Sequence, residues 1–174
     1  MGKEKIVYLV RHGQSEGNIT PVFQGPDSPL SEKGWEQAES IAKRVSKLSF
    51  EALIASPFLR AKETAETIAQ ATDTQPEYSE LFVERIKPES INSASHEDEN
   101  AQAAYREWIK SLHTSGMRVE NGENFDDLLM RADKALEYLK NRQEKSLVVV
   151  THGYFFAHNG CSRITWRISL GRGF

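Results

Sequence analysis

The hydrophobic residues of this chain occur in short continuous runs and in longer stretches with helical spacing. Continuous apolar runs lie at residues 6–10, 52–55 and 147–150, and polar residues or turn signals follow each of them. Short runs rich in β-branched side chains are typical of buried strands. We therefore predict a buried strand at each of these positions.

Other stretches place apolar residues three and four apart, which is the spacing of an amphipathic helix. Ser31 stands where the N-cap of the first such helix belongs. Ser56 and Pro57 form an N-cap and first-turn signature directly after the second strand. The predicted helices cover residues 32–47, a stretch that starts at Ser56-Pro57 and carries Ala61, Ala65 and Ile68 inward, residues 101–112, and residues 125–139.

Strands that alternate with helices predict an α/β fold, here a three-layer sandwich with helices on both sides of a mostly parallel central sheet. Residues 73–100 are polar, so we expect them to be mostly irregular. Residues 163–170 alternate polar and apolar positions, which predicts an edge strand. Asn159-Gly160 should break a helix after the third strand, and we expect the C-terminal part to be shortened. Residues 1–174 are expected to form a single domain.

The composition of the chain argues against two classes of function, nucleic-acid binding and membrane insertion. The chain has 174 residues, a net charge of -3 and 27% charged residues, which argues against a nucleic-acid-binding surface. The single cysteine, Cys161, cannot form an internal disulfide, and the first apolar run is far too short for a membrane span. We therefore expect a cytoplasmic protein that has neither nucleic acid nor membrane as a partner.

Charged or titratable residues follow each of the three strands. Arg11 and His12 follow the first, Arg60 lies shortly after the second, and His152 follows the third. Ligands of open α/β sheets bind at the carboxyl ends of the strands, so these four side chains are candidates for one pocket. Two arginines and two histidines, without a cluster of carboxylates, predict an anion site. A guanidinium near the N-terminus of a helix suits a phosphate.

Such a set of groups can support phosphoryl transfer without a metal or another cofactor. A neutral imidazole can act as the nucleophile, and arginines can compensate the charge on the phosphoryl oxygens. The leaving oxygen needs a proton, so a protonated carboxylic acid should lie close by.

The residues at this point resemble the histidine phosphatase superfamily, in its phosphoglycerate-mutase-like branch. The resemblance extends from residue 6 to residue 153 and rests on four blocks in this order. The blocks are Arg11-His12-Gly13 with Ser15 and Asn18; Gln24-Gly25 and Ser28-Pro29-Leu30-Ser31 with Gly34 and Gln37-Ala38; Ser56-Pro57 with Arg60-Ala61 and Thr64-Ala65; and Thr151-His152-Gly153.

The resemblance implies a role for each of the strand-end residues. His12 would be the nucleophile, because it is the histidine of the Arg-His-Gly block. Arg11, Arg60 and His152 would bind the phosphoryl group.

The loop after the first strand would face the substrate. The resemblance assigns Asn18, Gln24 and Gly25 to this surface, with Ser15 beside them. Ser15 and Asn18 could instead be loop residues that cap backbone N–H groups.

The acid of the family often appears as Leu-x-Glu after the second helix. The nearest match here is Phe82-Val83-Glu84-Arg85, and Glu80 and Glu89 are its competitors. The Gly-rich continuation that usually follows this glutamate is absent, so the middle segment does not indicate a particular substrate.

The favoured function is therefore a metal-independent phosphomonoesterase, which transfers a phosphoryl group to His12 and then to water. One alternative is a mutase of the phosphoglycerate type, which would return the phosphoryl group to its substrate. Another is a domain that binds phosphorylated ligands with weakened catalysis, because the C-terminus is atypical. The substrate would be a phosphorylated small molecule, although a phosphoprotein is left open, and the sequence does not indicate an oligomeric state.

Overall fold

A computed structural model describes residues 5–153 and 165–168 of the chain. Its strands pair in a parallel sheet with the order β3-β2-β4-β1-β5. The strands are β1 (Ile6–Arg11), β2 (Ala52–Ala55), β3 (Pro76–Tyr78), β4 (Ser146–Thr151) and β5 (Thr165–Ile168). The three strands predicted from apolar runs are β1, β2 and β4, which are neighbours in the middle of the sheet.

Four α-helices lie within the described residues, close to the predicted positions. They are α1 (Glu32–Val45), α2 (Leu59–Thr72), α3 (Glu99–Lys110) and α4 (Phe125–Asn141). Three short 3-10 turns are η1 (Glu16–Asn18), η2 (Glu80–Phe82) and η3 (Glu89–Ile91). The Ser31 hydroxyl accepts the backbone N–H of Gly34 at 3.1 Å, so Ser31 is the N-cap of α1, as predicted.

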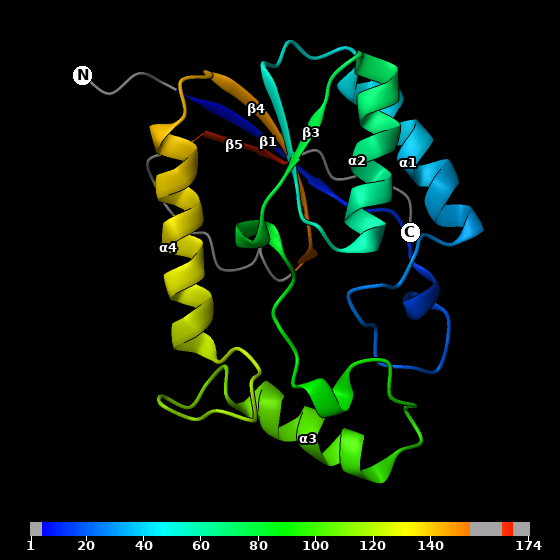
Figure 1. Ribbon diagram of the computed structural model, residues 1–174, viewed down its shortest axis with the longest axis vertical. Helices are drawn as coiled ribbons and strands as arrows, with labels where there is room; N and C mark the ends of the chain where they lie inside the picture. Colours follow the sequence, from blue (N-terminus) through cyan, green and yellow to red (C-terminus); the bar gives the residue numbers. More distant parts are fainter. Residues whose placement is uncertain (1–4, 154–164, 169–174) are drawn as a thin grey trace.

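The core has two halves, one on each face of the sheet. Val10 of β1 packs with side chains of α1 and α2, whereas Val7 and Leu9 pack with side chains of α4. This division follows from the alternation of side chains along a strand. Figure 1 shows α4 on one side of the sheet and α1 with α2 on the other. The predicted three-layer α/β sandwich is confirmed.

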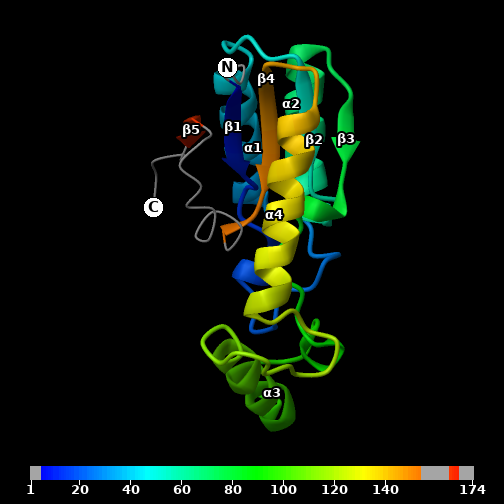
Figure 2. The ribbon, with the colours of Figure 1, turned by 90° about the vertical axis from the view of Figure 1, so that its left-hand side faces the viewer.

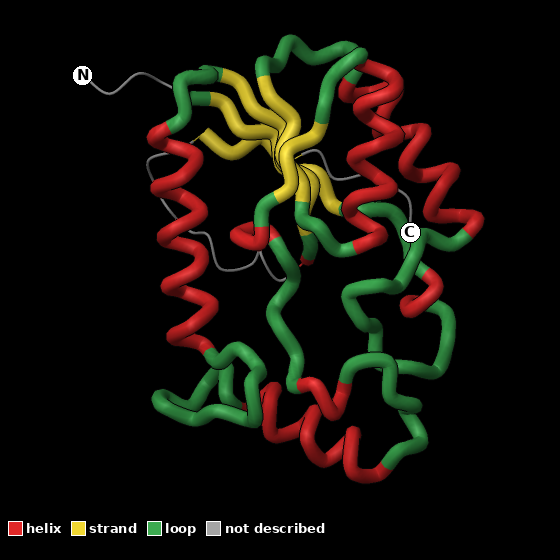
Figure 3. The backbone as a smooth tube through the Cα atoms, in the orientation of Figure 1, coloured by secondary structure: helices red, strands yellow, loops and turns green. Residues whose placement is uncertain are grey.

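α3 stands apart from these layers. Figures 1 and 2 show it beyond the end of the sheet toward which β1 and β4 run. Loops and 3-10 turns occupy the space between the sheet and α3, as the tube drawing shows (Figure 3). The carboxyl ends of the central strands therefore face a region built mostly of irregular chain.

Residues 73–100 are mostly irregular, as expected, but they include the short strand β3, whose three residues are partly or fully exposed and give no apolar signal. The predicted start of the second helix is wrong. This helix begins at Leu59 with Phe58 as its N-cap residue, not at Ser56-Pro57. The reason is that the Ser56 N–H still donates to Val150 of the neighbouring strand β4, at 2.9 Å, so the chain leaves the sheet later than the motif suggests.

The buried face of α4 carries Leu128, Ala132, Ala135, Leu136 and Leu139. Phe125 and Leu129 lie off this face and are exposed to 37% and 44%.

The predicted edge strand at residues 163–170 is present as β5, which pairs in parallel with β1 at one edge of the sheet. The predicted helix break at Asn159-Gly160 lies outside the described residues. Among the helices that the structure describes, none is long and apolar enough to cross a membrane.

Candidate active site

Strand pairing brings the two predicted histidines together. Arg11 of β1 pairs with Thr151 of β4, and the N–H of His12 donates to the Thr151 carbonyl at 3.2 Å. The residues that follow these strands therefore leave the sheet side by side. The ring centroids of His12 and His152 are 4.9 Å apart.

The His12 ring is held through both nitrogens. Nδ1 lies 2.6 Å from the Gly13 carbonyl oxygen, and Nε of Arg60 donates to Nε2 at 3.2 Å. Because a ring nitrogen that faces a carbonyl carries the hydrogen, Nε2 carries a lone pair. Burial, and then the charge of Arg60, lower the pKa of His12 to about 3. At neutral pH the imidazole is uncharged, and its Nε2 lone pair faces the guanidinium.

The lowered pKa of His12 predicts a loss of stability in acid. This pKa rises from about 3 in the folded protein to 6.5 in the unfolded chain, so the unfolded state binds more protons between these values. The contribution is complete above pH 6.5 and is lost as the pH falls. Because of His12, we expect the free energy of unfolding at pH 5 to be about 2 kcal/mol lower than at pH 7.

Urea denaturation of wild type and His12→Asn at pH 7 and pH 5 measures this contribution. The variant should lose less stability between the two pH values than the wild type. Equal losses would contradict a neutral, buried imidazole.

Arg60 lies in the first turn of α2 and is 1% exposed. Its Nη1 donates to the Gly25 carbonyl at 3.0 Å. Burial lowers the pKa of Arg60 to about 10, and the charge of Glu84 opposes this shift. The guanidinium is charged at pH 7, but its charge is only partly compensated. An anion bound beside it would complete the compensation.

His152 is fully buried and is held by Ser56. Its Nε2 lies 2.8 Å from the Ser56 hydroxyl, and Nδ1 has no hydrogen-bond partner among the described residues. Burial holds the pKa of His152 well below its usual range, and the charges of Arg60 and Lys87 add to this effect. Ser56, which the sequence suggested as an N-cap, instead positions a histidine.

Arg11 ends β1 and is exposed. Its guanidinium lies beside Gly153, where an added Cβ would be 3.8 Å from Arg11 Cζ. Within the described residues no hydrogen bond or ion pair engages this guanidinium. Its charge lowers the pKa of both His12 and Arg60, so it acts on the same site.

The predicted substrate-facing loop is held by its own side chains. Oδ1 of Asn18 accepts the N–H and the hydroxyl of Ser15, both at 3.0 Å, and the Gln24 amide donates to the same hydroxyl. Asn18 therefore caps a backbone N–H, which is the alternative that the sequence left open, while its side chain remains exposed. Gln24 and Gly25 lie closer to the cluster, because Gly25 binds Arg60.

Of the three candidate acids, Glu84 is placed beside the cluster. It is half-buried, and its charge raises the pKa of Arg60 and of Lys87. Glu80 and Glu89 are exposed, at the starts of η2 and η3.

Sequence reasoning missed Lys87. Its ammonium donates to the Gln24 carbonyl at 3.0 Å, and burial lowers the pKa of Lys87 to about 8. Its charge also acts on Arg60 and His152. A lysine three residues after Glu84 in an irregular segment carries no signal of its own, so the folded chain is needed to find it.

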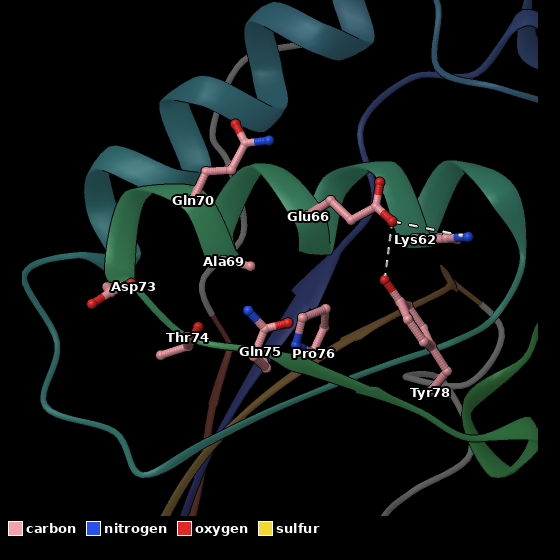
Figure 4. A pocket seen from close by; sticks show the side chains of 9 residues that line it. All are labelled: Lys62, Glu66, Ala69, Gln70, Asp73, Thr74, Gln75, Pro76 and Tyr78. Atoms are coloured by element: carbon pink, nitrogen blue, oxygen red, sulfur yellow. Dashed lines mark hydrogen bonds and ion pairs between the residues drawn. The ribbon is translucent and has the colours of Figure 1, made fainter.

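A separate hollow of about 500 Å³ lies elsewhere, at the C-terminal end of α2 and the edge strand β3 (Figure 4). The Tyr78 hydroxyl donates to Glu66 at 3.3 Å, and Lys62 lies 3.9 Å from the same carboxylate. These polar groups satisfy one another, and none of the predicted site residues lines the hollow.

The fold and the cluster define a class of protein: a parallel α/β domain whose central strands end at a cluster of two histidines and two arginines, a candidate anion site. In the described part of the chain, no group of three or more histidine, cysteine, aspartate or glutamate side chains could hold a metal ion. The chain belongs to the histidine phosphatase superfamily (branch 1), whose family model matches residues 7–169.

Curated relatives agree with this membership. A protein of Photorhabdus laumondii named "Probable phosphoglycerate mutase GpmB" is 37% identical over 155 residues, which is 84% of this chain and 69% of that protein. Its Escherichia coli namesakes are 34% identical over the same shares.

Solved structures are similar as well. YhfR of Bacillus stearothermophilus has a TM-score of 0.72 and 31% identity, over 86% of this chain and 75% of that chain. A phosphoserine phosphatase mutant of Entamoeba histolytica, in complex with phosphoserine, has a TM-score of 0.67 and 27% identity, over 85% and 74%. The α-ribazole phosphatase of Shigella flexneri, at 22% identity over 87% and 75%, supports the fold alone, with a TM-score of 0.75.

Proposed function

We propose that this protein is a phosphomonoesterase that transfers a phosphoryl group to His12 and then to water. One observation carries the proposal: a neutral imidazole presents its Nε2 lone pair to a buried, partly compensated guanidinium. A phosphoryl group bound by Arg60 would meet this lone pair directly, as nucleophilic catalysis requires.

Three side chains would bind the phosphoryl oxygens. Arg60 and Arg11 supply the positive charge, which the charge spread over three oxygens needs. The third is His152. Because the Ser56 hydroxyl can donate to its Nε2, the unpaired Nδ1 can carry a hydrogen and donate it to an oxygen.

The reaction would proceed in two steps. In the first, Nε2 of His12 forms a bond to phosphorus while the phosphorus–ester oxygen bond breaks, and protonated Glu84 gives its proton to the leaving oxygen. In the second, a water oxygen bonds to phosphorus, the phosphorus–nitrogen bond breaks, and Glu84 takes a proton from the water. Inorganic phosphate leaves, and both residues return to their starting states.

The relatives favour a phosphorylated small molecule as the substrate. The Entamoeba structure holds phosphoserine, and the curated relatives carry the name of a phosphoglycerate mutase. Lys87 adds a further cation, whose charge interacts with that of Glu84.

A mutase is the second candidate, because relatives at 37% and 34% identity bear that name. In this reaction the phosphohistidine would return its phosphoryl group to the substrate instead of to water. The two candidates share the first step and differ in the acceptor of the second.

Release of inorganic phosphate from a panel of small phosphomonoesters, including phosphoserine and 3-phosphoglycerate, tests the proposal. We expect release without added metal and without a bisphosphorylated primer. Turnover that requires the primer would favour the mutase. Binding of inorganic phosphate without turnover of any ester would contradict both activities and leave a binding domain.

A further inference from the structure

Side chains, instead of a paired strand, hydrogen-bond the backbone that leads to Glu84. The Thr151 hydroxyl of β4 donates to the Phe82 carbonyl at 2.7 Å. Nη1 of Arg131, on α4, donates to the carbonyls of Leu81 and Val83 at 3.1 and 2.9 Å. Its Nη2 lies 3.5 Å from the Glu84 carbonyl. One guanidinium thus engages the backbone up to and including Glu84.

Glu123 fixes this guanidinium and the other flank of Glu84. Its carboxylate accepts Nε and Nη2 of Arg131 at 2.6 and 2.7 Å, which is a bidentate pair. The same carboxylate accepts the N–H of Ile86 at 3.0 Å, and the Glu123 N–H donates to the Ile86 carbonyl at 2.9 Å. The backbone is therefore fixed on both sides of Glu84.

Arg85 anchors the same segment toward α3. It is 1% exposed, lies 3.8 Å from the centre of the Trp108 ring, and donates to the carbonyls of Glu123 and Trp108 at 3.0 and 2.7 Å. Its neighbour Glu84 acts instead on Arg60. The side chains of Arg85 and Glu84 therefore face different parts of the molecule, one toward α3 and the other toward the cluster around Arg60.

As a structural element alone, the Arg131–Glu123 ion pair would be a poor source of stability. Its side chains are 12% and 9% exposed, and an ion pair removed from water to this degree contributes little net stability compared with apolar residues of similar size. The pair does something that apolar residues could not, because it hydrogen-bonds four backbone groups around Glu84.

We propose that Arg131 and Glu123 are positioning residues for Glu84, an inference that rests on the proposed role of Glu84 as the acid. A proton donor must lie within hydrogen-bond reach of the leaving oxygen. Glu84 sits in irregular chain, so contacts from side chains outside this segment help to fix its position. The pair holds that chain so that the carboxyl group faces the cluster around Arg60.

The dependence of rate on the leaving group tests this proposal. Phenyl phosphate has a poor leaving group that needs a proton, whereas 2,4-dinitrophenyl phosphate has a good one that does not. We compare kcat/KM, which reports the steps through the first chemical step, for wild type, Glu84→Gln, Arg131→Met and Glu123→Gln. Glu123→Gln keeps the size of the side chain and serves if Arg131→Met does not fold.

We expect Arg131→Met and Glu123→Gln to lower kcat/KM for phenyl phosphate by about 10²-fold and to leave the dinitrophenyl ester within about threefold of wild type. Glu84→Gln should show the same pattern. The matched control is Arg142→Met, because Arg142 is the C-cap residue of α4, its side chain is 15% exposed, and it pairs with Glu77 and Glu144 instead. It should leave both esters unchanged.

Equal losses on the two esters, or no loss on either, would overturn the positioning role. A normal leaving-group pattern in Glu84→Gln would overturn it too, because Glu84 would then not be the acid. If the wild type hydrolysed neither ester, the proposed function itself would fail, and this inference with it.

Discussion

Replacing His12 with alanine is expected to lower kcat by at least about 10⁴-fold, the scale of loss seen when a covalent nucleophile is removed. The reason is geometric. His12 is the group whose lone pair faces Arg60, and the other histidine of the cluster has its Nε2 engaged with Ser56. Stopped assays of phosphate release from phosphoserine and phenyl phosphate measure the change.

The same variant should still bind inorganic phosphate, because Arg11, Arg60 and His152 remain. Equilibrium dialysis with phosphate separates loss of chemistry from loss of the site. His113→Ala, at an exposed position after α3, is the matched control and should keep full activity. Retained turnover by His12→Ala would contradict the proposed nucleophile.

Replacing Arg60 with methionine is expected to lower kcat/KM by about 10³-fold, since a guanidinium that stabilises a transferring phosphoryl group contributes on this scale. It should do so without unfolding the protein. Burial that lowers the pKa of Arg60 from 12.5 to about 10 corresponds to a cost of about 3 kcal/mol for the charge. Methionine removes this cost but leaves the Gly25 carbonyl without its donor, and the two changes roughly offset each other.

Phosphate release and urea denaturation, measured on the same preparation, test both halves of this expectation. Arg44→Met, at an exposed position in the last turn of α1, is the control and should change neither. A loss of stability in proportion to the loss of activity would show that Arg60 serves the fold instead of the phosphate.

The central strands and the strand-end residues could be predicted because both depend on local sequence. A buried β-branched run identifies β1 or β4 without knowledge of its partner. The carboxyl ends of parallel strands meet at one edge, so Arg11, His12 and His152 could be expected together from the order of the elements. The structure shows them there, joined by Arg60.

The features that were missed depend on contacts between distant parts of the chain. β3 is short and polar, and its pairing with β2 defines it. Ser56 binds His152, which lies 96 positions away, and this contact replaces the helix cap that the local motif indicated. Lys87 and Arg131 are tied to the site by hydrogen bonds to backbone carbonyls. Every residue has a backbone carbonyl, so the sequence does not show which one a side chain will bind.

The central claim is a phosphoryl group carried by His12, and trapping it is the most direct test. Wild-type protein is mixed with a rapidly hydrolysed phosphomonoester, quenched in alkaline denaturant and digested for mass spectrometry. The account predicts one added phosphoryl group on the peptide that contains His12, stable in base and lost in acid, and absent from His12→Ala. Rapid turnover with the His12 peptide unmodified, or with the phosphoryl group on another residue, would contradict it.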